Sequence, residues 1–340
     1  MQGPPANYSS NSSVPAHNRA KVYELNAHTG RELWSYTTRA AIYSSPVVSD
    51  GTVYVGSNDG GLYALNAANG KKLWSYATGG GWSVPAVVNE VVYVGSSKES
   101  GDNVFAINAR TGALLWSFAT GFSVYSSPTV VKGVLYVMSL DYRLYALDAD
   151  TGAELWHFST EGYAYASPVV ANGVVYFDGM PGTVFAVNAK TGVLLWSFVA
   201  GGSWAEFSPA VADGVVYAAS DGGYAYALDG ATGTELWSYS PIGFVSLAAP
   251  VVANGVVYFG TWDNNLYALS ANKGERLWSY TFGGYIEGSP TVANGVVFVG
   301  SDDGKVYAFG LKHGLGKQEA AATRPSLKVL RPDLSLKVPN

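Results

Sequence analysis

The sequence predicts an all-β fold, a β-propeller of four-stranded antiparallel blades, on three observations. Tryptophan recurs at nearly constant spacing, each repeat holds four short β-branched or aromatic runs, and Gly, Asn and Asp separate those runs. Of 340 residues, 48% are hydrophobic, 14% are aromatic and only 13% are charged, and 41 are glycines. Many short strands joined by tight turns have this composition.

The period is set by seven tryptophans that lie 40, 42, 40, 40, 41 and 41 residues apart. Such regular spacing indicates a repeat fold in which each unit is one supersecondary element. Helical solenoids of similar period would show 3.6-residue periodicity and far less glycine, so we discount them. The seven residues are Trp34, Trp74, Trp116, Trp156, Trp196, Trp237 and Trp278.

One repeat, residues 44–76, shows the four predicted strands as PVV, TVYVG, LYAL and LWSY. Asp50-Gly51 and Asp59-Gly60 are hairpin-turn dipeptides, because both residues of such a turn must accept a positive φ. Four strands joined by tight turns form an antiparallel meander. A meander of about forty residues, repeated around a closed ring, is typical of a propeller.

The ends of the repeat region leave the blade count open. Six units are complete, and the seventh, residues 289–310, stops after three strands. We prefer seven blades closed by N- and C-terminal strands, with LWSY at residues 33–36 supplying the missing fourth strand. The alternative is eight blades, in which residues 325–338 give two strands and VYEL (22–25) with LWSY completes the blade. Against it, Gln318 stands where the next tryptophan belongs.

We expect three segments: a flexible N-terminal arm over residues 1–20, the propeller over 21–310, and a basic C-terminal arm over 311–340. The C-terminal arm carries six Lys or Arg residues against two acidic ones. The simple interpretation is that both arms are solvated or loosely docked tails. The alternative is that an arm, or the VYEL edge, pairs with a neighbouring molecule by strand addition.

Composition excludes several classes of function. The chain has no cysteine, which removes disulfides, thiolate catalysis and Cys-ligated metals, and its four histidines lie far apart. A net charge of −5 argues against nucleic acid as the main partner. The chain contains no run of eighteen apolar residues, so we predict no transmembrane segment. The first twenty residues also lack the basic and apolar regions of a secretion signal.

A motif, A-x-[DN]-x-x-[TN]-G-x-x-x-W, carries the periodic tryptophans; one copy is Ala146, Asp148, Thr151, Gly152 and Trp156. Glycine suits a left-handed turn between the third and fourth strands. The tryptophan supplies a large apolar ring and an N–H that can reach a carbonyl of the neighbouring blade. We therefore assign the seven periodic tryptophans to structural docking between blades.

Over about residues 21–310 this motif resembles the repeat of the pyrroloquinoline-quinone (PQQ)-like β-propeller family. The resemblance implies a bacterial, extracytoplasmic protein: periplasmic, at the cell surface or secreted. The family includes both quinoprotein oxidoreductases and the propeller lipoprotein of outer-membrane protein assembly, which has no catalytic residues. The resemblance is specific for the fold and leaves the function open.

One face of the predicted ring carries the candidate ligand or partner residues. The second-to-third and fourth-to-first connections emerge on the same side of a propeller. The residue three positions before each repeat's proline varies there while its neighbours hold constant, which is where a propeller usually places specificity. The alternative is that these rings only plug the channel. The candidate residues are Tyr43, Trp82, Tyr125, Tyr165, Trp204, Glu206, Trp262, Asp263 and Glu287.

Three functions compete, and we assign no catalytic residue and no metal site. We prefer a non-catalytic protein-interaction scaffold or assembly component, possibly self-assembling through its arms, with a protein partner or a second copy as the occupant. The alternative is a binder of small molecules or glycans through the aromatic and acidic face. The second alternative is a PQQ-dependent oxidoreductase; only there would PQQ and Ca²⁺ be expected as cofactors.

The oxidoreductase alternative rests on the family resemblance. In those enzymes PQQ stacks on a tryptophan beneath a vicinal disulfide and acidic side chains hold calcium. Here Trp82, Trp204 or Trp262 would be the stacking partner, and Glu206 or Asp263 a calcium ligand. The chain has no cysteine for the disulfide, and its constant spacing leaves no room for the insertions that bury the cofactor.

Overall fold

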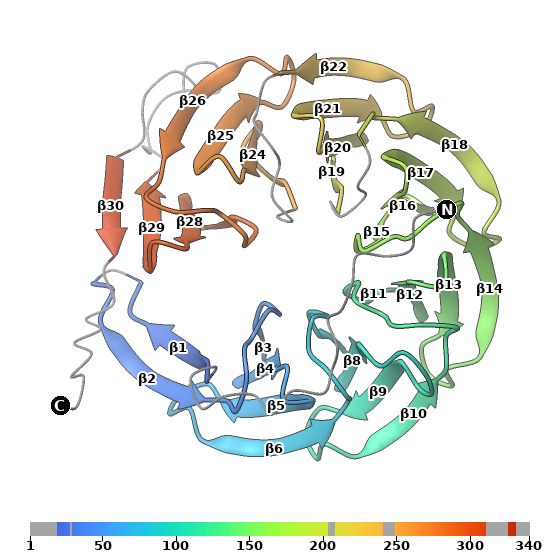
Figure 1. The fold of residues 1–340 in the computed structure, drawn as a ribbon, viewed down its shortest axis with the longest axis vertical. Helices are drawn as coiled ribbons and strands as arrows, with labels where there is room; N and C mark the ends of the chain where they lie inside the picture. Colours follow the sequence, from blue (N-terminus) through green and yellow to red (C-terminus); the bar gives the residue numbers. More distant parts are fainter. Residues whose placement is uncertain (1–18, 28, 203–207, 241–248, 311–325, 331–340) are drawn as a thin grey trace.

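The structure, a computed structural model, describes residues 19–27, 29–202, 208–240, 249–310 and 326–330. This part of the chain is all-β and contains no helix, so no helix in it is long and apolar enough to cross a membrane. Seven four-stranded antiparallel sheets form a ring around a central axis (Figure 1), which confirms the predicted seven-bladed propeller.

Each blade is a meander whose first strand lies toward the axis and whose fourth lies at the rim (Figure 1). Blade one comprises β3 (Val47–Ser49), β4 (Thr52–Gly56), β5 (Gly61–Asn66) and β6 (Lys72–Ala77). Blade two comprises β7 (Ala86–Val88), β8 (Val91–Gly95), β9 (Val104–Asn108) and β10 (Leu114–Phe118). Blade three comprises β11 (Thr129–Val131), β12 (Val134–Ser139), β13 (Arg143–Asp148) and β14 (Glu154–Ser159). Blade four comprises β15 (Val169–Ala171), β16 (Val174–Gly179), β17 (Thr183–Asn188) and β18 (Leu194–Val199).

The remaining blades repeat this order. Blade five comprises β19 (Ala210–Ala212), β20 (Val215–Ser220), β21 (Tyr224–Asp229) and β22 (Glu235–Tyr239). Blade six comprises β23 (Val251–Ala253), β24 (Val256–Gly260), β25 (Asn265–Ser270) and β26 (Arg276–Thr281). Blade seven comprises β27 (Thr291–Ala293), β28 (Val296–Ser301), β29 (Lys305–Gly310) and β30 (Ser326–Leu330).

The core lies between neighbouring blades and not within any single one. Second and third strands are buried on both faces, because each packs against the blade before it and the blade after it. One cluster joins Met138 and Leu144 of blade three to Phe177 of blade four, all with 0% exposure. Fourth strands alternate between half-buried and exposed side chains, since only one of their faces is covered.

The periodic tryptophans lie between blades. Trp116 of β10 donates its indole N–H to the carbonyl of Ala149 in blade three, with an N···O distance of 2.9 Å. Its ring lies on Gly152, where a Cβ atom would come within 2.6 Å of the ring. Five other tryptophans donate in the same way to the following unit: Trp34, Trp74, Trp156, Trp196 and Trp237.

The closure of the ring differs from the prediction in its details. LWSY does not complete the last blade: it lies in β2 (Glu32–Thr37), which pairs with β1 (Lys21–Leu25) as a separate two-stranded sheet. Instead β30, from the predicted C-terminal arm, pairs with β29 as the fourth strand. The eight-bladed pairing of this arm with β1 is not observed among the described residues. The sheet β1–β2 lies between blades seven and one (Figure 1).

Candidate functional site

Four of the predicted face residues form one continuous aromatic row at the start of blades one to four. Tyr43 and Trp82 are stacked, with ring centroids 4.3 Å apart and planes 13° from parallel. Trp82 contacts Tyr125 at 5.8 Å, and Tyr125 stacks on Tyr165 at 6.0 Å. We call these four side chains the aromatic row. Its first two members are 54% and 42% exposed, so the row presents apolar surface to solvent.

The aromatic row extends outward at blades three and four. Tyr163 lies 6.4 Å from Tyr165 and makes an edge contact of 4.7 Å with Tyr142, which follows β12. Aromatic pairs at these distances stabilise beyond their buried area by about 0.5–1.5 kcal/mol. Tyr142 is not among the predicted face residues; it stands in the connection SLDYR, whose sequence departs from the plain turns SNDGG and SDDGK of other repeats.

A set of hydrogen bonds between consecutive blades fixes the backbone that carries the row. The N–H of Val84 donates to the Ser127 hydroxyl at 3.1 Å, and the N–H of Ser127 donates to the Ser167 hydroxyl at 2.8 Å. Ser167 in turn donates to Ser208 at 2.7 Å. Each of these residues directly precedes the repeat's proline, so the recurring Ser-Pro dipeptide was the sequence signal for them.

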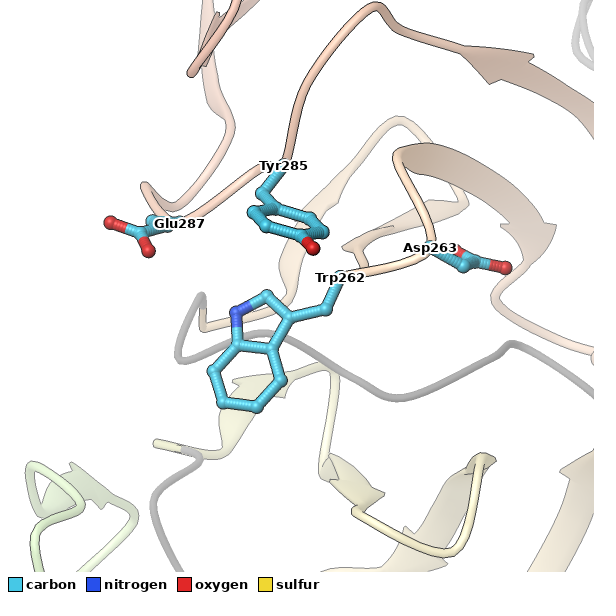
Figure 2. Close-up of a pocket in the computed structure, with 4 residues that line it drawn as sticks. All are labelled: Trp262, Asp263, Tyr285 and Glu287. Carbon is cyan, nitrogen blue, oxygen red and sulfur yellow. The ribbon is translucent and has the colours of Figure 1, made fainter.

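A pocket of about 450 Å³ lies beside blades six and seven, lined by Trp262, Asp263, Tyr285 and Glu287 (Figure 2). The two aromatic side chains occupy the centre of the view, and the two carboxylates lie on opposite sides of them. Partial burial, and then the charge of Asp302, raises the pKa of Glu287. Trp262 and Tyr285 are 42% and 53% exposed, so a ligand has access to both rings.

The aspartates of the second-to-third connections serve the fold. Asp141 accepts from the Tyr145 hydroxyl at 2.6 Å and from the Gly121 N–H at 2.7 Å. Burial, followed by this hydrogen bond, raises the pKa of Tyr145 to about 12. Asp263 accepts hydrogen bonds from Thr261 and, at 3.4 Å, from Tyr267 in the same way. These carboxylates hold a turn against its own third strand.

Two predicted face residues, Trp204 and Glu206, lie outside the described residues. The remaining seven are placed: four in the aromatic row, and Trp262, Asp263 and Glu287 around the pocket. The structure thus divides the predicted face into a stacked aromatic part and an aromatic–acidic part.

The described residues do not provide a metal-ligand set for the calcium of a quinoprotein. No group of three His, Asp or Glu side chains comes together among them. Asp263, the described candidate ligand, is hydrogen-bonded by Thr261 and Tyr267.

The family model described as "Outer membrane protein assembly factor BamB" matches residues 2–117, 77–197, 164–247 and 243–338. The chain belongs to this family. No protein among curated sequences matches it. The BamB resemblance covers both the propeller and most of the two arms.

Solved structures show the same fold at low identity. BamB from Moraxella catarrhalis superposes with a TM-score of 0.74 and 20% identity, covering 88% of this chain and 91% of that chain. The computationally designed protein Ika8 gives 0.72 and 18%, with 86% and 90% covered. The quinohemoprotein alcohol dehydrogenase ADHIIG from Pseudomonas putida HK5 gives 0.68 and 17%, with 91% and 70% covered.

Proposed function

We propose that this BamB-family propeller is a non-catalytic scaffold that binds a protein of outer-membrane protein assembly through the aromatic row. The observation that carries the proposal is an exposed, pre-stacked row of Tyr43, Trp82, Tyr125 and Tyr165. Tyr and Trp are enriched at protein interfaces, since they bury large rigid surfaces at little entropic cost. Membership of the BamB family supports a protein partner and an extracytoplasmic location for this chain.

The rigidity of the aromatic row favours binding over plugging. Its rings are held by one another and by the serine hydrogen bonds beneath, so little side-chain freedom is lost when a partner covers them. A pure plug would bury its outermost rings, yet Tyr43 and Trp82 remain about half exposed. The partner segment that suits the row is apolar or aromatic, with a polar rim.

The test is binding to the outer-membrane protein assembly complex depleted of its own BamB. We expect Tyr43→Ala with Trp82→Ala to weaken binding at least tenfold, because truncating a central aromatic anchor costs about 2 kcal/mol or more. Leu155→Ala is the matched control: Leu155 is 51% exposed on β14 at the rim, far from the row. Equal affinities for the double variant and the wild type would refute the assignment of the row.

The small-molecule or glycan alternative is supported by the pocket at Trp262 and Tyr285. Its volume of about 450 Å³ falls within the usual range for ligand sites. Aromatic faces beside carboxylates suit sugar rings and cations. This alternative places the ligand at the pocket, and the scaffold proposal places its partner at the aromatic row.

The oxidoreductase alternative is favoured by the quinoprotein dehydrogenases among the similar structures. Under this alternative, PQQ with Ca²⁺ should raise the melting temperature. A ligand that binds only the native state stabilises it by about 2.7 kcal/mol at a hundred times its dissociation constant. We expect PQQ with Ca²⁺ to leave the melting temperature unchanged. A clear, saturable rise in Tm would establish a cofactor site and overturn the non-catalytic assignment.

A further inference from the structure

The pocket at Trp262 and Tyr285 is formed where connections of two neighbouring blades meet. Trp262 and Asp263 lie in the connection between β24 and β25 of blade six. Tyr285 and Glu287 lie in the connection from β26 to β27, which leads into blade seven. The side chains of the pocket therefore come from segments that differ between repeats and not from the repeated strands.

The turn that carries Trp262 is held by hydrogen bonds. The N–H of Thr261, a residue with 0% exposure, donates to the carbonyl of Asn265 at 3.0 Å. One carboxylate oxygen of Asp263 accepts from the Thr261 hydroxyl, and the other accepts from the Tyr267 hydroxyl at 3.4 Å. The turn thus presents the indole of Trp262, 42% exposed, from a fixed backbone.

The connection that carries Tyr285 and Glu287 is anchored between these two residues. Ile286 has 0% exposure and packs in the core cluster that includes Phe282. The carbonyl of Tyr285 accepts a hydrogen bond from the N–H of Asp302 at 3.0 Å, which ties the connection to the turn between β28 and β29. With Ile286 in the core, its two neighbours line the pocket, and the Tyr285 ring is 53% exposed.

The pocket carries negative charge. Its described lining contains the carboxylates of Asp263 and Glu287 and no basic side chain. Partial burial and the nearby charge of Asp302 both raise the pKa of Glu287, so these two carboxylates repel each other. Lys305, at the start of β29, is already paired with Asp303 at 2.7 Å. A positively charged ligand relieves this repulsion, whereas a neutral sugar leaves it in place.

The two aromatic rings of the pocket suit a cation. In the aromatic row, Tyr43 covers a face of Trp82 at a centroid distance of 4.3 Å. Trp262 and Tyr285, both within the described residues, form no such stacked pair with each other. A cation is attracted to the face of a Trp or Tyr ring within about 6 Å of its centroid. The carboxylates of the pocket lie on opposite sides of the rings and add to that attraction (Figure 2).

The acceptor atoms indicate which kind of cation fits. A primary ammonium or a guanidinium needs acceptors for several N–H donors, and both oxygens of Asp263 already accept a hydrogen bond. A quaternary ammonium has no N–H donor to satisfy, and aromatic rings are its usual binding partners in proteins. An anionic group attached close to the cation would be repelled by Asp263 and Glu287.

We propose that the pocket binds a quaternary ammonium ligand of the choline type, with no anionic group beside the cation. The rings of Trp262 and Tyr285 contact the methylated cation, and the carboxylates of Asp263 and Glu287 balance its charge. The inference rests on the small-molecule alternative, whose ligand class it names, and concerns a surface separate from the aromatic row.

Calorimetric titration of the full chain with choline chloride tests the ligand class. We expect saturable binding. The neutral alcohol in which a tert-butyl group replaces the trimethylammonium group has the same shape, and should bind at least tenfold more weakly because it lacks the charge. Glycine betaine, which adds a carboxylate, should also bind more weakly than choline. No saturable binding of choline, or equal binding of the neutral alcohol, overturns the proposal, as does binding of methyl glucoside without binding of choline.

Variants locate the site. Trp262→Leu and Glu287→Gln should each weaken choline binding at least fivefold, because each removes one attraction for the cation. The matched control is Glu161→Gln, which removes an exposed carboxylate from the connection into blade four and should leave the affinity within about twofold. Equal losses for Glu161→Gln and Glu287→Gln would place binding outside the pocket and contradict the proposal, provided circular dichroism shows intact folds.

The titration also separates this proposal from the scaffold proposal. It contains no protein partner, so absence of choline binding leaves the assignment of the aromatic row unchanged. The partner-binding assay contains no choline, so its failure leaves the pocket assignment unchanged.

Discussion

Trp116→Ala is expected to lower the free energy of unfolding by about 3–5 kcal/mol, because it deletes a large ring packed between two blades. The ring lies 5.9 Å from Tyr93, rests on Gly152 and donates its N–H to Ala149 at 2.9 Å. Urea denaturation followed by circular dichroism measures the loss. The free energy of unfolding of Trp116→Phe should lie between those of the wild type and Trp116→Ala. Phenylalanine keeps most of the apolar area but leaves the carbonyl of Ala149 without this donor.

Trp82→Ala provides the matched control, because it removes the same side chain from an exposed position. Trp82 is 42% exposed and contacts the rings of Tyr43 and Tyr125, so we expect a loss of about 1–2 kcal/mol, below that of Trp116→Ala. Similar losses for Trp116→Ala and Trp82→Ala would show that the periodic tryptophans do not join the blades.

The glycine of the motif probes the same contact from the other side. Gly152→Ala places a Cβ 2.6 Å from the Trp116 ring at a φ of 73°, whereas Gly133→Ala meets no atom within 4 Å at a φ of 77°. Both variants carry the cost of about 1 kcal/mol or more for a left-handed alanine. Only Gly152→Ala must also displace the indole, so its additional loss measures the packing between blades.

The blades were predictable from the sequence because each is built from local contacts. Strands such as β3 and β4 are adjacent in the chain and joined by the two-residue turn Asp50-Gly51, so period and turn chemistry specify them. The docking motif could also be recognised from the sequence, since residues equivalent to Gly152 and Trp156 recur at a fixed offset in successive repeats. The aromatic row followed from repeat-equivalent positions such as Tyr43 and Trp82, which the ring brings together.

The strand pairing that closes the ring could not be predicted, because the same fourth-strand pattern is compatible with more than one third strand. LWSY in β2 has the pattern of the fourth strands in blades one to six, so its sequence does not say which third strand it pairs with. Pairing with β1 closes a loop of only six residues, from Asn26 to Arg31, whereas pairing with β29 closes one of more than 260. The longer loop costs more entropy, which favours the local hairpin.

We expect the second large effect on stability at Asp178, where removal of the side chain should stabilise the folded protein. Its side chain is 4% exposed in β16, and its Oδ1 atom has no hydrogen-bond partner among the described residues. Burial raises the pKa of this carboxyl well above its usual value. The other six blades hold small or apolar residues at this position, namely Gly56, Gly95, Met138, Ala219, Gly260 and Gly300. Asp178→Ala should therefore raise the free energy of unfolding at pH 7 by about 1–3 kcal/mol.

The pH dependence gives the sharper test. Because the folded pKa of Asp178 is raised, the folded protein holds a proton that the unfolded chain releases above about pH 4. The wild type should consequently lose stability as pH rises from about 4 to the folded pKa, and then level off. Asp178→Ala and Asp178→Asn should both remove this decline, which urea denaturation at a series of pH values will measure.

Asp148→Ala supplies a control of opposite sign. Hydrogen bonds from the hydroxyl and N–H of Thr151 lower the pKa of Asp148, so its contribution is present above the unfolded pKa and is lost as pH falls through the folded one. Removing it should lower stability at neutral pH and leave stability at low pH unchanged. If Asp178→Ala instead behaves like Asp148→Ala, the buried carboxyl is charged and partnered in the folded protein, and blade four depends on it.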